Sequence, residues 1–201
     1  MPETEKMYYE KGYKLVAGVD EVGRGPLAGP VCAAAVILPE GLVLDGVDDS
    51  KKITEKKREL LFDVITENAV AWATAFVEPE IIDEINIRNA THLAMQRAVN
   101  ALDEKADFLL VDGNDKIPFE DVECEYIVKG DSKFMCIAAA SIVAKVVRDR
   151  YMREMDKEYP GYGFAKNKGY GTQEHMVAIR TQGMTPLHRR SFMTDKVLGR
   201  E

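Results

Sequence analysis

Acidic residues recur at the ends of apolar segments in this chain. Asp20 ends the run KLVAGVD, and Glu21 follows it directly. Asp112 ends the run FLLVD, and Asp131 follows EYIVKG. Because functional side chains gather at strand ends in α/β sheets, we expect these four carboxylates to lie at one site.

A group of carboxylates without His or Cys favours hard, oxygen-seeking cations, so Mg²⁺ or Mn²⁺ is expected rather than zinc. Two such ions, about 3.5–4 Å apart, can activate a water and stabilise the leaving oxygen in phosphoryl chemistry. Each acid also has an ordinary interpretation. Asp112 precedes Gly113, as a turn residue does, and Asp131 could cap the helix that follows. It is the coincidence of the strand ends that favours a metal site.

The segment GVDEVGRGPLAG raises a question of geometry. Strict strand alternation sends Asp20 and Glu21 to opposite faces, so both can reach one site only if the backbone bends, which Gly23 and Gly25 would permit. The loop matches neither a P-loop nor a dinucleotide-binding fingerprint. Glycine pairs mostly mark turns, but they also let main-chain groups approach a ligand as closely as reading a ribose 2′-hydroxyl requires.

Hydrophobic periodicity predicts the elements that position these residues. Strands are expected over 14–20, 31–38, 69–78, 107–112 and 124–131, and the first two are expected to pair antiparallel. Helices are expected over 54–68, from Pro79 onward and over 89–102, about 135–158 and 172–182. This pattern predicts an α/β fold, a mixed sheet with helices on its faces. Residues 1–201 are expected to form a single domain, with residues about 160–201 as a small C-terminal helical appendage.

Composition limits the class of protein. The chain of 201 residues is 46% hydrophobic and 30% charged, which is typical of a globular domain. We see neither a secretory signal nor an apolar run of about 18–20 residues that could span a membrane. Three cysteines without metal-site spacing are expected to be reduced thiols, as in a cytoplasmic protein.

Charge is distributed unevenly along the chain. Residues 1–128 carry 13 Lys and Arg against 26 Asp and Glu, whereas residues 129–201 carry 14 against 8. The basic C-terminal third could contact an anionic polymer, or it could be ordinary solvated surface. Candidate phosphate contacts are Lys129, Lys133, Lys145, Arg148, Lys166, Lys168, Arg189 and Arg190. Asp149, in the long helix, is expected to pair with an arginine about four residues away.

Taken together, the motifs resemble one family. GVDEVGRGPLAGPV, DDSKKITEKKRE, LLVDG, KGDSKFMCIAAASIVAKVVRDRYM, YGFAKNKGYGTQEH and HRRSF are similar, in this order, to the motifs of bacterial type 2 ribonuclease H, ribonuclease HII. The resemblance extends from about residue 14 to residue 193. The related type 3 enzymes have a long N-terminal extension that is not seen here, so type 2 is the better match.

The resemblance implies a ribonuclease H-like fold and an activity. The expected reaction is endonucleolytic hydrolysis 5′ to a ribonucleotide, in RNA–DNA hybrids or in duplex DNA with embedded ribonucleotides, leaving 3′-hydroxyl and 5′-phosphate ends. It implies Mg²⁺ or Mn²⁺ as cofactor, with two ions in the substrate complex. The sequence itself does not determine the oligomeric state, and a monomer is our expectation. The four acids match the family's metal ligands: Asp20, Glu21, Asp112 and Asp131.

The resemblance also implies residues that bind the substrate. Gly23, Arg24 and Gly25 match the loop that contacts the 2′-hydroxyl and phosphate at the RNA–DNA junction. Tyr170 matches the tyrosine that packs against the sugar of the following deoxynucleotide. Weaker candidates, with solvated surface or a structural role as the alternative, are Ser50, Lys51, His188 and Arg189.

Two other classes of function are compatible with the same residues. One is a non-catalytic RNA–DNA hybrid binding module, which predicts binding without turnover. The other is a metal-dependent phosphatase or nucleotide-binding enzyme, which is disfavoured for nucleotide hydrolysis because no P-loop is present.

Overall fold

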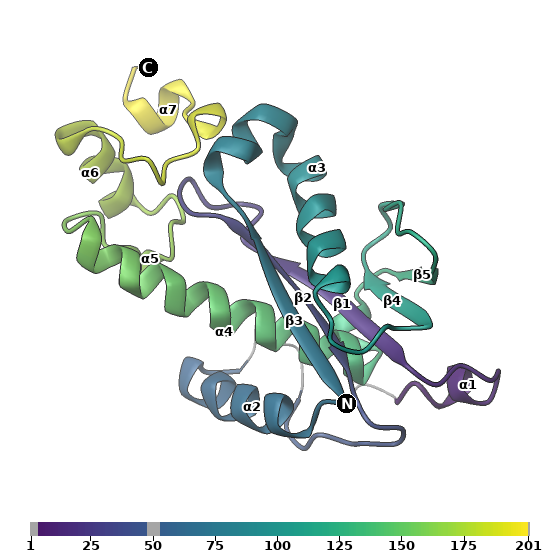
Figure 1. Cartoon of the computed structure of the whole chain (residues 1–201). Coiled ribbons are helices and arrows are strands. Elements are labelled where there is room, and N and C mark those ends of the chain that lie inside the picture. The colour runs from purple at the N-terminus through teal and green to yellow at the C-terminus, as the bar shows by residue number, and fades with distance from the viewer. Residues whose placement is uncertain (1–3, 48–52, 201) are drawn as a thin grey trace.

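A computed structural model of the chain describes residues 4–47 and 53–200 (Figure 1). Five strands form within these ranges: β1 (Val16–Val22), β2 (Val31–Ile37), β3 (Ala71–Val77), β4 (Phe108–Asp112) and β5 (Glu123–Ile127). The α-helices there are α1 (Lys6–Tyr9), α2 (Glu55–Asn68), α3 (Pro79–Asn100), α4 (Met135–Glu158), α5 (Phe164–Asn167), α6 (Gln173–Gln182) and α7 (Asp195–Leu198). Two 3₁₀ turns are η1 (Gly130–Ser132) and η2 (Arg190–Phe192).

The described strands form one mixed sheet in the order β3-β2-β1-β4-β5. β1 pairs antiparallel with β2, and β2 pairs antiparallel with β3. β4 pairs parallel with β1, and β5 pairs parallel with β4. The predicted mixed α/β sheet and its antiparallel first pair are confirmed.

Helices cover both faces of this sheet (Figure 1). On one face Val19 of β1 and Val111 of β4 pack with Ala94 of α3 in the largest apolar cluster. On the other face α4 lies against β1 and β2, and α2 packs on α4. The apolar run of β4 is therefore buried from both sides, as is usual for a strand in the interior of a sheet covered by helices on both faces.

The contact between β1 and α4 is unusually close because both partners are small. A Cβ added to Gly18 would lie 2.1 Å from the main-chain carbon of Cys136 and 2.3 Å from the nitrogen of Ile137. The alanines that follow, Ala138 to Ala140, are buried against β2. These small residues allow close packing, which fixes the start of α4 against the centre of the sheet.

Several element boundaries differ from the expectations by one or more residues, and three of the differences concern the site or the path of a helix. β1 continues to Val22, two residues beyond the expected end, and β5 ends at Ile127, before the loop that was included in the expected strand. The helical stretches expected from Pro79 and over 89–102 form one element, α3, which is kinked at Asn86. There φ is 67°, and the side-chain oxygen of Asn86 accepts a hydrogen bond from the amide of Asn89, so the second part of α3 starts with its own cap.

The C-terminal elements pack around their own apolar cluster. It includes Phe164 of α5, Ile179 of α6 and Val197 of α7, together with Leu27 from the loop after β1 and Met152 of α4. The first part of α3 is tied to the same region. The carboxylate of its Asp83 accepts hydrogen bonds from the main-chain amides of Arg190 (2.8 Å) and Ser191 (2.9 Å). In the part of the chain that the structure describes, no helix is long and apolar enough to cross a membrane.

Replacing Gly18 with alanine tests the close approach of β1 and α4. Because the new Cβ meets helix backbone, which cannot rotate away, we expect Gly18→Ala to lower the free energy of unfolding by about 3 kcal/mol or more. Urea denaturation measures this directly. Gly25→Ala is the matched control, since its Cβ would lie 3.7 Å from the nearest atom, an ordinary contact. Equal stability of the two variants would contradict the packing described.

Candidate functional site

Asp20 and Glu21 leave β1 on opposite faces of the sheet. Their neighbours set the alternation, since Val19 lies in the cluster with α3 and Gly18 contacts the backbone of α4. Asp20 is therefore on the α4 face and Glu21 on the α3 face. The pairing with β2 is unbroken in register up to Val22, so the expected bend in the backbone is wrong.

The two carboxylates reach one site because β4 ends beside them. The β1–β4 register runs to Val19 opposite Val111, and β4 ends at Asp112. This register places Asp112 opposite Asp20, so the edge of β1 is open from Glu21 onward, and side chains from both faces can meet there. Strand length, and not a local bend, brings the two acids together.

The loop after β5 carries the fourth acid to the same place. The amide of Gly130 donates a hydrogen bond of 2.6 Å to a carboxylate oxygen of Asp112. This bond joins the end of β4 to η1, in which Asp131 follows Gly130. Phe134 follows shortly after and directly precedes α4, which begins at Met135. Asp112 thus holds the loop that carries Asp131 to the same place.

All four acids line one pocket of about 380 Å³. The structure therefore brings together the carboxylates singled out by sequence, although Asp20 lies within β1 and not at its end. The pocket wall is formed by Asp20, Glu21, Val22, Arg58, Asp112, Asp131, Ser141, Lys145 and Tyr170. Arg58 and Ser141 were not predicted as site residues, because a helix-surface arginine and a small serine in a packing motif carry no signal of their own.

The electrostatics of the pocket are those of a repulsive cluster. Burial raises the pKa of Asp20, and the charges of Glu21 and Asp112 raise it further, while a hydrogen bond from Ser141 lowers it. Burial also raises the pKa of Glu21, which Arg24 opposes. Within residues 4–47 and 53–200 no three His, Cys, Asp or Glu side chains are already arranged as a metal cluster. The donor set itself, carboxylates in one polar pocket, suits hard divalent cations.

The loop after β1 rests on the buried side chain of Arg148 in α4. Its guanidinium is fully buried and donates hydrogen bonds to the carbonyls of Pro30 (2.9 Å), Lys168 (2.9 Å) and Ala28 (3.2 Å). Gly23, with φ of 93°, passes directly over it, and a Cβ there would lie 2.3 Å from Nε of Arg148. Glycine is required at this position for both conformation and space.

Arg189 holds the same loop from the other side, and it corrects a prediction. Its side chain is fully buried and donates to the carbonyls of Gly29 (2.9 Å), Arg24 (3.0 Å) and Gly23 (2.6 Å). A direct contact of Arg189 with phosphate, as expected from the sequence, does not fit this position. Because a trans peptide is planar, carbonyls directed at Arg189 turn the amides of Arg24 and Gly25 to the opposite side. These two residues are exposed, so their N–H groups face outward.

Tyr170 stands beside this loop. Its side chain is 42% exposed and lines the pocket of the four acids. A Cβ on Gly25 would lie 3.7 Å from its ring, and the Arg24 guanidinium lies 3.4 Å from a carboxylate oxygen of Glu21. The residues predicted to contact a ribonucleotide are therefore adjacent to those predicted to hold metal ions. Ser50 and Lys51 fall outside the described residues.

His188 is also buried, contrary to its expected approach to a phosphate. It is 3% exposed, and its Nε2 lies 3.1 Å from Nε2 of His175. Its Nδ1 accepts a hydrogen bond of 2.9 Å from the amide of Thr185. Burial lowers the pKa of His188 to about 4, and the neighbouring His175 contributes to this shift, so the ring is neutral at pH 7. A neutral, enclosed imidazole does not serve as a phosphate contact.

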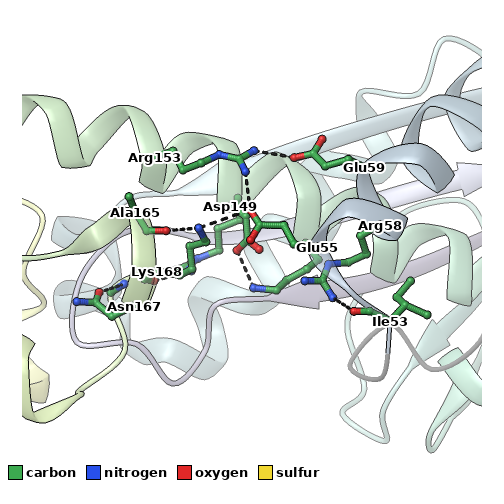
Figure 2. A network of polar contacts seen from close by, with 12 residues as sticks. Ile53, Glu55, Arg58, Glu59, Asp149, Arg153, Ala165, Asn167 and Lys168 are labelled. Atoms are coloured by element: carbon green, nitrogen blue, oxygen red, sulfur yellow. Dashed lines mark hydrogen bonds and ion pairs between the residues drawn. The ribbon is translucent and has the colours of Figure 1, made fainter.

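Part of the basic C-terminal third is balanced by acids of α2 (Figure 2). Arg153 contacts both Glu55 (2.5 Å) and Glu59 (2.6 Å), and Arg150 contacts Glu59 (2.5 Å). Lys168 is mostly buried, donates to the main chain and lies 3.8 Å from Glu55. The uneven charge of the sequence is therefore partly compensated within the fold, and Lys168 is not the exposed phosphate contact that was expected.

Asp149 does not pair with an arginine as expected. Its partner is Lys145, one turn earlier in α4, at 2.6 Å. Burial lowers the pKa of Lys145, which also lines the pocket of the four acids. Asp149 thus holds Lys145, which among the described residues is the predicted phosphate-binding lysine at the pocket wall. The other candidates that stay exposed are Lys129, Lys133, Lys166 and Arg190.

The five-stranded mixed sheet flanked by helices has the fold of ribonucleases H2 and H3. The sequence model of the family Ribonuclease HII matches residues 17–195. The chain is 56% identical over 188 residues to the Ribonuclease HII of Acetivibrio thermocellus, covering 94% of this chain and 73% of that protein. The chain therefore belongs to the ribonuclease HII family and is an endoribonuclease of type 2.

Solved structures agree with this fold. Ribonuclease H2 from Pyrococcus horikoshii matches with a TM-score of 0.79 and 28% identity, covering 92% of this chain and 98% of that one. Bst-RNase HIII, solved in complex with Mn²⁺, matches with a TM-score of 0.67 and 20% identity, covering 94% and 70%. The second likeness shows the shared fold only.

A lysine in place of Arg189 tests the role of its guanidinium. Lysine cannot direct donors at three carbonyls, so buried acceptors lose their partners, and we expect Arg189→Lys to lower the free energy of unfolding by about 3 kcal/mol. The adjacent Arg190 has an exposed side chain, and Arg190→Lys is expected to change stability by less than about 0.5 kcal/mol. Thermal and urea unfolding of both variants give the comparison, and similar losses at the two positions would contradict this role.

The buried His188 predicts a dependence of stability on pH. Since the pKa falls from 6.5 to about 4 on folding, the unfolded chain takes up the proton first as the pH drops. Stability is then lost from about pH 6.5 downward, and the loss reaches about 3 kcal/mol near pH 4. The difference between wild type and His188→Asn, measured by urea unfolding at each pH, isolates this contribution from that of the carboxylates. Parallel curves would contradict it.

Proposed function

We propose that this ribonuclease hydrolyses the phosphodiester 5′ to a ribonucleotide, in RNA–DNA hybrids or at ribonucleotides embedded in duplex DNA. The products are 3′-hydroxyl and 5′-phosphate ends. The observation that carries the proposal is the convergence of four acids on one pocket that is also lined by Tyr170 and lies beside the Gly23–Gly25 loop. Membership of the family supports the same reaction.

The acids of the pocket are proposed to hold Mg²⁺ or Mn²⁺, two ions in the substrate complex. Their mutual repulsion, which burial strengthens, is relieved by cations. When bound, such ions supply an activated water and neutralise charge on the phosphate. The proposed ligands are Asp20, Glu21, Asp112 and Asp131.

Recognition of the ribose is proposed to come from the loop held by the buried arginines. The outward amides of Arg24 and Gly25 are donors for the 2′-hydroxyl and the phosphate at the junction. The carbonyls of the same two peptide groups, those of Gly23 and Arg24, are already engaged by Arg189. The peptide planes therefore cannot rotate freely, and the donors are preorganised. Tyr170, half-exposed beside them, offers a ring face to the sugar of the next nucleotide. Lys145, at the pocket wall, is a candidate contact for the phosphate backbone.

A duplex with one embedded ribonucleotide tests this function, with the all-DNA duplex of the same sequence as the substrate control. We expect a single cut on the 5′ side of the ribonucleotide with Mg²⁺ or Mn²⁺, none with a chelator, and a 5′-phosphate on the downstream product. Binding without any cleavage would instead support the non-catalytic hybrid-binding module.

Asp20→Asn separates catalysis from folding. We expect cleavage to fall by about 10²-fold or more, because a group that stabilises charge in the transition state is lost. The raised pKa of Asp20 means that its ionised form disfavours the folded state at neutral pH, so the melting temperature in metal-free buffer should stay equal or rise. Asp63→Asn, an exposed position on α2, is the control for both measurements. Wild-type cleavage by Asp20→Asn would refute the assignment.

A further inference from the structure

Two histidine rings meet inside the C-terminal cluster. His175, in the first turns of α6, is fully buried, and its Nε2 lies 3.1 Å from Nε2 of His188. Phe164 packs edge-on against His175, with 5.3 Å between ring centroids, and Tyr162 lies 5.2 Å from His188. The pair is therefore enclosed by aromatic rings, and its hydrogen bonds are made within the protein.

The hydrogen-bond partners of the two Nδ1 atoms determine which nitrogen of each ring carries the proton. The amide of Thr185 can only donate, so Nδ1 of His188, at 2.9 Å, is an acceptor and the proton of this ring is on Nε2. That proton is donated to Nε2 of His175, whose own proton is then on Nδ1. Nδ1 of His175 donates it to the main-chain carbonyl of Tyr170 at 2.9 Å. One directed series of hydrogen bonds thus connects residue 185 to Tyr170.

The segment that ends at Tyr170 is held by its carbonyls. The carbonyl of Lys168 accepts from Arg148, and that of Gly169 accepts from the amide of Leu27 at 2.8 Å. The carbonyl of Tyr170 accepts from Nδ1 of His175 and also from the amide of Thr172, at 2.8 Å, so the histidine is the side-chain part of the last of three successive anchors. The second anchor joins this segment directly to the loop after β1, and the first does so through Arg148, which also donates to the carbonyls of Ala28 and Pro30. The third joins it to the C-terminal part.

We propose that His175 is a positioning residue for Tyr170, and that His188 acts by holding His175 in the tautomer that donates to the Tyr170 carbonyl. This rests on the proposed function, in which Tyr170 packs against the sugar after the ribonucleotide. The pair does not touch the substrate. It sets the orientation of Tyr170, and so the preference for a deoxynucleotide at that place.

Asparagine and glutamine separate the two ring nitrogens of His175. The amide of asparagine falls near Nδ1 and keeps the donor to Tyr170, whereas that of glutamine falls near Nε2 and faces His188 instead. Both variants remove the same ring from the aromatic cluster, so the loss of packing is matched.

At position 188 the pattern is reversed. His188→Gln keeps a donor directed at His175 and so keeps its tautomer. His188→Asn keeps the acceptor for the amide of Thr185 but leaves His175 without a fixed tautomer. The proposal thus predicts that asparagine is the better substitute at 175 and glutamine the better one at 188.

The experiment measures kcat and KM on two duplexes, in which the ribonucleotide is followed by a deoxynucleotide or by a second ribonucleotide. We expect His175→Asn and His188→Gln to keep the wild-type ratio of kcat/KM within about threefold, and His175→Gln and His188→Asn to lower it about tenfold, toward that of Tyr170→Ala. Equal ratios within each pair would overturn the proposal. So would failure of the wild type to cleave at a ribonucleotide, an outcome that refutes the proposed function as well and is seen in the same assay.

The tautomers are also open to measurement in the wild-type protein, which covers the case of variants that do not fold. Long-range ¹H–¹⁵N NMR spectra of the histidines should show the proton of His175 on Nδ1 and that of His188 on Nε2. The opposite assignment for His175 would overturn the proposal whatever the variants do.

Discussion

The site depends on two guanidinium groups that are buried against main-chain carbonyls. Burial of a charge is costly unless hydrogen bonds replace its hydration, and a planar guanidinium has enough donors to do this without a carboxylate. Arg148 and Arg189 use the carbonyls of a loop that has few side chains of its own. The loop after β1 is thereby fixed on its inner side, and its exposed amides keep one orientation. A glycine loop that would otherwise be flexible becomes a rigid surface for recognition.

The sheet supplies the other half of the site. β1 is long enough to present acids from both faces, and β4 is short enough to leave room for them beside Asp112. The close packing of Gly18 on α4 fixes the strand that carries Asp20, and Asp112 in turn holds the loop of Asp131. These carboxylates repel one another, and bound cations would relieve this unfavourable interaction. The site is thus built at some expense of stability, as is usual where charges of one sign converge.

Much of this arrangement could be predicted from the sequence. Alternating and apolar runs placed all five described strands and the long helix, and the acids were recognisable because they follow such runs. The sequence did not predict how the Glu21 side chain reaches the site, because this depends on where the neighbouring strand β4 ends. Nor did it predict the burial of Arg148 and Arg189, since arginine is mostly exposed and only the tertiary fold brings carbonyls around it. The same holds for His188, whose partner lies 13 residues away in another element. Lys168 and Arg153 lie against acids of α2, so the number of basic residues in a stretch of sequence overestimates the basic surface that is available to a ligand.

Hydrogen exchange at the loop after β1 tests the central claim most directly. In Arg148→Lys the carbonyls of Ala28, Pro30 and Lys168 lose their directed donors, while the helix around position 148 is kept. We predict that the amides of Leu27, Ala28 and Gly29 exchange at least about tenfold faster than in the wild type, whereas those of β4 do not change. Unchanged protection of the loop would show that its conformation does not depend on the buried guanidinium, and would contradict the account.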